Sequence, residues 1–239
     1  IVTIDDSITV NGQTPILDAA GRHVTGALFA GATVSGISEV EAVREAVDSE
    51  YNALFTDIMH PEFDVRTAFN PHSSVIPITR IEGFSYSLLS ATRGDRSITG
   101  QGGLVRFDGG YDSFEGKTVV FVEVSGHAAR TVGGSRAVHW MLLQQAFSER
   151  QRNAELDLLT PIGQKTLQDV SRNGIFVFSA NRASDIMQVL AFAAQHAIDV
   201  VIHGGREAWL VADALAQTDT PVMLNALDNL PSDFDSLGA

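Results

Sequence analysis

The stretch GIFVFSANRASDIMQVLAFAAQHAIDVVIHGGREAWLVADALAQTDTPVML, residues 174–224, decides the fold. Three apolar runs of strand length follow one another from its start, at 174–180, 199–203 and 220–226. Amphipathic helices are predicted between these runs, at Ala183–His196 and Glu207–Gln217. Strands that alternate with helices in this way form a parallel sheet. An open doubly wound sheet and a closed barrel both satisfy the pattern.

The same alternation extends toward the N-terminus. Further strands are predicted at 26–31, 83–91 and 118–124, and further helices at Glu39–Val47, Arg136–Leu158 and Ile162–Arg172. Several of the strands are near-continuous apolar runs, which is typical of strands buried on both faces. The glycine-rich segment 98–110 lacks the lysine of a phosphate-binding loop, and we interpret it as a loop and hairpin. Six strands result, whereas a complete (β/α)₈ barrel has eight.

Composition narrows the class of partner. The chain of 239 residues carries a net charge of −13, which argues against nucleic acid because an acidic surface repels phosphate. No apolar run approaches the roughly 20 residues of a membrane span. Cysteine is absent, so disulfides, cysteine zinc sites and thiol nucleophiles are excluded. A small molecule is therefore the expected partner, and the sequence is compatible with a homo-oligomer.

Residues at the C-terminal ends of the predicted strands are the candidates for chemistry, because barrel enzymes carry their sites there. The polar candidates are Ser90, Glu123, Ser125, Ser179, Asn181, His203 and Asn225. Only Glu123 and His203 are strong ligands for a divalent metal. None of the seven histidines is paired as His-x-His or His-x-x-x-His, the spacings that direct two imidazoles to one metal. We interpret His203 as a polar wall residue of a pocket, and a ligand role as the alternative.

Two further motifs bear on chemistry. No Gly-x-Ser-x-Gly elbow occurs, and Ser135, which follows two glycines, is interpreted as the N-cap of the helix after it. The segment HGGRE, residues 203–207, places two glycines and Arg206 before a predicted helix. Backbone N–H groups at such a position bind phosphate. A phosphate-binding barrel is therefore a further interpretation.

Four segments, GRHVTGALFAG (21–31), RTAFNPHSSVIPITRIEGFSYSLL (66–89), SITGQGGLVRFDG (97–109) and the stretch 175–224, together resemble the imidazolonepropionase-like branch of the amidohydrolase superfamily. The resemblance implies an α/β fold, a TIM-like (β/α)₈ barrel formed by residues 28–239 without the last strand. It also implies a small β-sandwich, to which residues 1–27 contribute. The chemistry that it implies is attack of a metal-bound hydroxide on a carbon–nitrogen bond.

Carried over position by position, the resemblance implies a degenerate metal site. The His-x-His pair of the first strand is replaced by ALFAG (27–31), and the fifth strand ends in Ser179-Ala180-Asn181 without an imidazole. Glu123 stands where the fourth strand supplies a ligand, and His203 stands at or beside the ligand of the sixth strand. Zinc, if bound, is expected on Glu123 and His203. The residues expected to contact substrate are Gln101, Ser179, Asn181, Arg206 and Asn225.

Two functions follow from this pattern. The first is a metal-dependent hydrolase of carbon–nitrogen bonds, such as those of amides or dipeptides, with a degenerate site. The second is a catalytically silent barrel of the same fold that binds a ligand or a partner. The chain begins without Met and ends in NLPSDFDSLGA, and we expect it to be a fragment of a longer protein. Analogy with exported members of the branch suggests the periplasm.

Overall fold

The computed structural model describes residues 5, 7–39, 43–51, 59–91, 96–149 and 158–225. Seven strands of these residues form one sheet in the order β1 to β7. The strands are β1 (Leu28–Thr33), β2 (Phe84–Leu89), β3 (Ile98–Arg106), β4 (Phe114–Glu123), β5 (Ile175–Ala180), β6 (Val200–Gly204) and β7 (Val222–Leu224). The α-helices are α1 (Val75–Ile81), α2 (Gly126–Thr131), α3 (Arg136–Glu149), α4 (Pro161–Asn173), α5 (Ala183–His196) and α6 (Ala212–Gln217). Three short 3₁₀ helices are η1 (Arg44–Ala46), η2 (Val65–Ala68) and η3 (Ala208–Val211).

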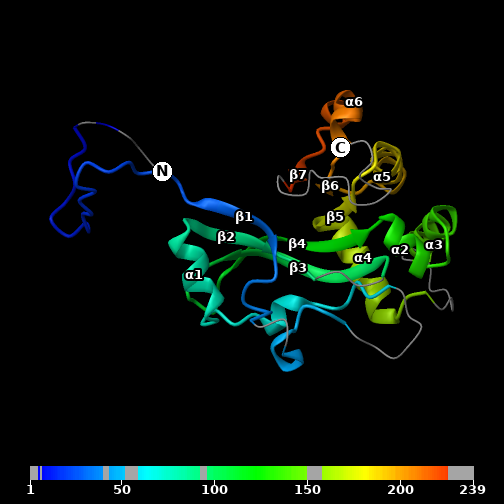
Figure 1. The fold of residues 1–239 in the computed structure, drawn as a ribbon, viewed down its shortest axis with the longest axis horizontal. Helices are drawn as coiled ribbons and strands as arrows, with labels where there is room; N and C mark the ends of the chain where they lie inside the picture. The colour runs from blue at the N-terminus through cyan, green and yellow to red at the C-terminus, as the bar shows by residue number, and fades with distance from the viewer. Residues whose placement is uncertain are drawn as a thin grey trace.

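The sheet is that of an incomplete barrel. Strands β4 to β7 are parallel neighbours, and β1 and β2 form another parallel pair. The sheet curls so that β5, β6 and β7 run steeply across the direction of β3 and β4, with α3 and α5 outside it (Figure 1). Strands β1 and β7 are the two edges of the sheet. The predicted α/β class, an incomplete TIM-like barrel, is confirmed.

Strand β3 corrects the interpretation of the glycine-rich segment as a loop. Residues 98–106 form a strand that is antiparallel to both β2 and β4, and only the turn that leads into β4 is the expected hairpin. The glycines serve close packing. A Cβ on Gly102 would lie 1.9 Å from the carbonyl oxygen of Leu89 in β2. Glycine therefore lets the two backbones approach, and the sheet has seven strands where six were predicted.

The N-terminal segment corrects a second expectation. The turn signal Asn11-Gly12 predicts short β segments on either side of it, at 8–10 and 15–19, but residues 7–27 contain no strand. This segment stands away from the sheet in Figure 1 and leaves Ile16 and Leu17 exposed. An isolated strand has no partner for its backbone hydrogen bonds, so these apolar residues cannot form a sheet alone. Whether residues 1–27 join a sandwich stays a prediction, and residues 1–4 lie outside the described part.

The helices follow the predictions closely where the sequence is periodic. Helix α5 has the predicted bounds, and α4 extends the predicted helix by one residue at each end. The hydroxyl of Ser135 accepts a hydrogen bond from Val138 N at the start of α3, as predicted for an N-cap. The expected helix Glu207–Gln217 divides into η3 and α6. In the segment predicted as the helix Glu39–Val47, the described residues form only one helical element, the short 3₁₀ helix η1.

Successive side chains of β4, β5 and β6 point to opposite faces of the sheet. These strands therefore contribute to two apolar layers, one on each face. One set of side chains faces the helices: Val120, Val122, Phe176, Phe178 and Ile202 belong to the same core as Leu143 and Phe147 of α3. The alternate set, with Phe121, Val177 and Val201, forms a smaller cluster on the inner face. Strands buried on both faces were predicted from the apolar runs, and the burial of β5 confirms this. None of the described helices combines the length and apolarity that crossing a membrane requires.

A buried polar pair joins α3 to the sheet. His139 Nε2 lies 2.7 Å from the hydroxyl oxygen of Ser97, just before β3, and both residues are buried. Burial, together with the charge of Arg136, lowers the pKa of His139 from 6.5 to about 4. Arg136 also forms an ion pair with the buried Asp185 of α5, with an N–O distance of 3.1 Å. The imidazole of His139 is therefore neutral in the folded protein at neutral pH.

The substitution Gly102→Ala tests the close approach of β2 and β3. The added methyl group would collide with backbone rather than with a flexible side chain, so we expect the free energy of unfolding to fall by about 2–3 kcal/mol. Urea denaturation measures the change. Gly26→Ala is the matched control, because no atom lies within 4 Å of its Cβ position. Equal denaturation midpoints for the two variants would contradict the packing.

The lowered pKa of His139 predicts a loss of stability in acid. Above the usual pKa of 6.5 both folded and unfolded states are neutral, and the residue contributes nothing to pH dependence. Between pH 6.5 and about 4 the unfolded chain binds a proton that the folded chain does not, so stability falls as pH falls. From pH 7 to pH 5 we expect a loss of about 2 kcal/mol from this residue. Urea titrations at both pH values should show that His139→Gln removes this part of the slope.

Candidate active site at the barrel mouth

A cavity of about 310 Å³ lies at the C-terminal ends of the parallel strands. Each of the seven strands, or the residue directly after it, contributes to its wall. Strand β3 contributes Thr99 from its opposite end because it runs antiparallel. The polar side chains of the wall are Ser90, Thr99, Glu123, Ser179, Asn181, His203 and Asn225. We call this cavity the mouth cavity.

Three of these residues form one row across three strands. Glu123 of β4 is in register with Ser179 of β5, which is in register with His203 of β6. Two residues earlier on the same strands stand Phe121, Val177 and Val201, which belong to the inner apolar cluster. Alternation along a strand directs residues two apart to the same face. The inner apolar cluster is thus the floor of the mouth cavity, and the polar row is its next layer.

The row is held by local contacts. The hydroxyl oxygen of Ser179 lies 3.5 Å from His203 Nδ1. Glu123 Oε1 accepts a hydrogen bond from Ser125 N at 3.2 Å, just beyond the end of β4. Ser125 in turn is the N-cap of α2, where its hydroxyl accepts from Ala128 N. The start of α2 therefore fixes the carboxylate at the end of β4.

Asn181 follows β5 and presents a buried acceptor. Its side-chain oxygen Oδ1 is shielded from solvent and has no hydrogen-bond partner. Its backbone oxygen accepts from Glu207 N at 2.9 Å. A Cβ on Gly204 would lie 2.5 Å from Asn181 Oδ1, and the φ angle of Gly204 is +92°. Glycine is therefore required beside this amide, both for the space and for the backbone conformation.

Glu207 is a supporting residue that the sequence did not single out. Its Oε2 accepts from Ala183 N at 2.9 Å, at the start of α5, while its own N–H donates to Asn181. The loop after β6 is thereby tied to the loop after β5. A carboxylate at the first residue of a predicted helix has no distinctive spacing, so pattern alone does not reveal this role.

Two of the predicted substrate-contacting residues lie elsewhere. Gln101 lines a separate cavity of about 280 Å³ beside α4, together with Asp169 and Asn173. Arg206 lines an apolar groove of about 500 Å³ next to Trp209, which shares only Gly204 and Asn225 with the mouth cavity. The structure therefore brings together Glu123, Ser179, Asn181, His203 and Asn225, and it separates Gln101 and Arg206 from them.

The phosphate-binding interpretation of residues 203–207 does not agree with the hydrogen bonds there. Gly205 N donates to Ala180 O, and Glu207 N donates to Asn181 O. Ala208 N donates to Gly205 O. These amides already have backbone acceptors, so they do not form an open anion-binding loop.

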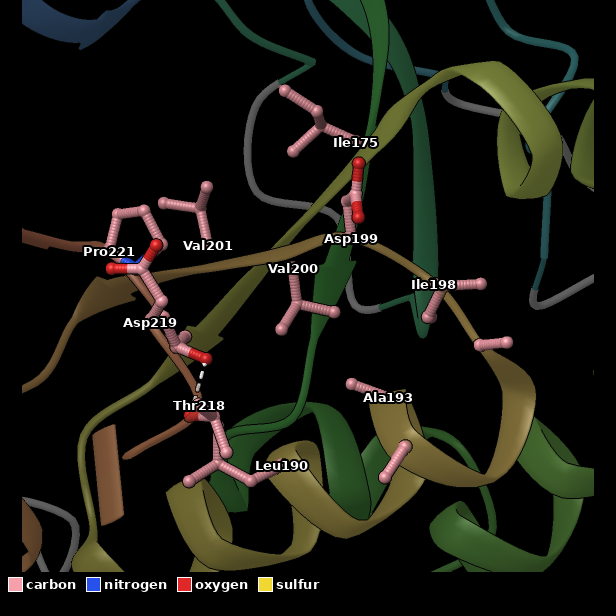
Figure 2. A pocket seen from close by; sticks show the side chains of 13 residues that line it. Ile175, Leu190, Ala193, Ile198, Asp199, Val200, Val201, Thr218, Asp219 and Pro221 are labelled. Carbon is pink, nitrogen blue, oxygen red and sulfur yellow. Dashed lines mark hydrogen bonds between the residues drawn. The ribbon is translucent and has the colours of Figure 1, made fainter. Parts of the chain in front are cut away.

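Another cavity, of about 530 Å³, lies at the opposite ends of the strands. Figure 2 shows that aliphatic side chains such as Leu190, Ala193 and Val200 form much of its wall, near the carboxylates of Asp199 and Asp219. Its residues precede β6 and β7, so it belongs to the N-terminal ends of the strands. That face of a barrel contributes to stability rather than to chemistry.

The residues of the mouth cavity fit poorly with a catalytic zinc ion. Such a site normally has three protein ligands and an open position. In the part of the chain that the structure describes, the mouth cavity offers two strong ligands, Glu123 and His203. Among the residues that the structure describes, no group of three His, Cys, Asp or Glu side chains is placed to hold a metal. We therefore assign no chemical step to zinc.

Comparison with known proteins gives the fold. No protein-family model and no curated protein sequence matches the chain. Its structure is similar to a crystal structure described as an amidohydrolase from Thermotoga maritima MSB8, with a TM-score of 0.82 and 17% sequence identity. The similarity covers 99% of this chain and 66% of the other, so the chain spans slightly less than two thirds of that protein. The chain therefore has an amidohydrolase-like fold.

Metal analysis tests the predicted zinc ligands. With two strong ligands in the mouth cavity, we expect purified protein dialysed against metal-free buffer to retain clearly less than one zinc ion per chain. We also expect His203→Ala to leave the zinc content unchanged, as should the control His72→Ala, a substitution of an exposed histidine. One equivalent of zinc that disappears in His203→Ala alone would show that His203 is a ligand after all. Inductively coupled plasma mass spectrometry gives the measurement.

Proposed function

We propose that the protein is an amidohydrolase-like hydrolase that binds a small polar molecule in the mouth cavity and cleaves a carbon–nitrogen bond in it. The observation that carries the proposal is the convergence of all seven strands on one cavity whose wall holds a carboxylate, an imidazole, hydroxyls and carboxamides. Cavities of this volume, about 310 Å³, are at the small end of the range for ligand sites. The class of reaction follows the name of the similar structure and the resemblance of the sequence.

The groups of the polar row have distinct roles in this proposal. His203 is the proton-transfer group, because its Nδ1 lies 3.5 Å from the Ser179 hydroxyl and its ring borders the cavity. An imidazole takes and returns protons near neutral pH. It would take a proton from an attacking water and return one to the leaving nitrogen. Ser179 orients the imidazole through their contact.

The remaining polar groups would hold the substrate. The carboxylate of Glu123 would accept hydrogen bonds, and the side-chain carboxamides of Asn181 and Asn225 belong to the wall at the ends of β5 and β7. The apolar floor of Phe121 and Val177 beneath them excludes water from one side. A buried, partly apolar site strengthens each polar contact with a ligand.

A catalytically silent barrel is the second candidate. The observation that favours it is the small set of strong metal ligands in the mouth cavity, which among the described residues comprises Glu123 and His203. In such a protein the same cavity would bind a small molecule without turning it over. Both candidates have a small molecule as the partner, and they differ in the fate of the bound molecule.

Hydrolysis assays on a panel of N-acyl amines, lactams and dipeptides distinguish the two candidates. We expect the release of free amine, and a decrease of roughly 100-fold or more in kcat/KM for His203→Ala. His72→Ala is the matched control and should keep the activity of the unaltered protein. A substrate that is cleaved equally well by His203→Ala would place the reaction outside the mouth cavity. Binding of a panel member without turnover would identify the silent barrel.

A further inference from the structure

We infer that a second cavity, on the helix side of the sheet, binds a small neutral molecule with several hydroxyl groups, a monosaccharide or a cyclic polyol. It is the cavity of about 280 Å³ that Gln101 lines beside α4, and we call it the side pocket. Among the described residues, its wall and that of the mouth cavity have no member in common. The inference is therefore independent of the proposed function and adds a binding site to it.

The first observation is a carboxamide at a position of the sheet whose neighbours belong to the apolar core. Gln101 of β3 is in register with Val120 of β4, and both Val120 and Ile98 pack in the helix-facing core. In the part of the chain that the structure describes, the side chain of Gln101 has no hydrogen-bond partner, and its polar atoms are accessible to solvent. It lines the side pocket, so a bound molecule can reach it. A half-buried carboxamide without a protein partner favours such a contact.

Helix α4 supplies three further polar side chains to the side pocket. Thr166, Asp169 and Asn173 are spaced by three and four residues, so they lie along one face of the helix. None of the three side chains forms a hydrogen bond or an ion pair with any residue that the structure describes. Thr166 is half-buried, whereas Asp169 and Asn173 are exposed. These groups are therefore available to a molecule in the side pocket.

Tight packing of backbone holds the two sides of the side pocket together. A Cβ on Gly174, directly after α4, would lie 2.7 Å from the carbonyl oxygen of Thr118 in β4. The hydroxyl of Thr118 accepts a hydrogen bond from Arg66 Nη1 at 3.1 Å, which leaves its own proton for the side pocket. Arg66 is itself held by Asp64 in an ion pair with an N–O distance of 2.7 Å. The wall formed by β4 and the end of α4 is thus fixed before a ligand binds.

The composition of the wall determines the class of ligand. It combines two hydroxyls, two carboxamides and one carboxylate with the apolar side chain of Val170. Hydroxyls and carboxamides both donate and accept hydrogen bonds, and a carboxylate accepts them from O–H groups. A ring with several hydroxyls matches this wall, because each of its hydroxyls also donates and accepts. The carboxylate of Asp169 disfavours an anion.

The size of the side pocket agrees with a single ring. Its volume of about 280 Å³ is just below the range of about 300–1,000 Å³ for pockets that hold drug-sized ligands. A monosaccharide or a cyclic polyol is smaller than such ligands. We therefore expect weak binding, with a dissociation constant of about 1–10 mM.

NMR titrations of the isotope-labelled protein test the inference. The probes are D-glucose, D-galactose and myo-inositol, with D-glucuronate as the anion, D-glucosamine as the cation and cyclohexanol as the ring with one hydroxyl. We expect at least one neutral polyol to bind, and cyclohexanol and D-glucuronate to bind at least about tenfold more weakly than that polyol. The backbone amide signals of Gln101 and Asn173 should shift, whereas those of Ser179 and His203 in the mouth cavity should not.

Two variants test the residues of the wall. Gln101→Leu should weaken the binding of the polyol by about fivefold, and Asp169→Ala by about tenfold. The matched controls are Gln217→Leu and Asp213→Ala, two substitutions of exposed residues on α6. Both controls should bind the polyol as the unaltered protein does, and circular dichroism verifies that every variant is folded.

Four results would overturn the inference. The first is that no neutral polyol binds to the folded protein at 50 mM, about five times the weakest affinity expected. The second is that cyclohexanol binds as tightly as the polyols, which would show that the hydroxyl groups are not recognised. The third is that D-glucosamine binds more than about tenfold more tightly than D-glucose, which would make the side pocket a cation site. The fourth is that the shifted signals belong to the mouth cavity alone.

Discussion

The parallel register of β4, β5 and β6 is the constraint on which the rest of the structure depends. It aligns Glu123, Ser179 and His203 across three strands, directly above an apolar floor. A shift of one residue in any of these strands would turn its polar residue toward the helices and bring an apolar side chain into the mouth cavity. The large outer core, with Phe176, Phe178 and Ile202 packed against α3 and α5, opposes such a shift. The same packing that stabilises the fold therefore holds the polar row in place.

The last third of the fold could be predicted from the sequence because its local signals agree. Apolar runs, amphipathic helices and spacing all point to parallel strands between residues 174 and 224, and α5 has the predicted bounds. The middle of the chain could not be predicted in this way. The glycines of 98–106 suggested a loop, since nothing local shows that Leu89 of another strand passes against Gly102. A contact between residues distant in sequence thus determines that 98–106 is a strand, and local composition does not show this contact.

The candidate site could be predicted in part for a similar reason. Residues that directly follow buried parallel strands, such as Asn181 and Asn225, were found because strand ends converge. Gln101 was separated from them because it is in register with Val120 of β4, whose side chain belongs to the helix-facing core, so Gln101 lies on the α4 side of the sheet. Arg206 was separated because the backbone after β6 turns away at Gly204 and Gly205, both of which have positive φ. The buried, unpartnered oxygen of Asn181 is a property of packing and has no signature in the sequence.

The reversed direction of β3 has a consequence for the evolution of the loops. The connection from β3 to β4, residues 107–113, leaves the sheet at the end remote from the mouth cavity, whereas Ser90 and Ala91, directly after β2, line that cavity. Ser113 and Gly110 both donate to Asp108 within the remote connection, so it is a self-contained turn. Insertions or deletions in that turn can accumulate without altering ligand choice, while a change of length at the rim alters the entrance itself. Changes of loop length should therefore be tolerated at one end of β3 and constrained by the ligand site at the other.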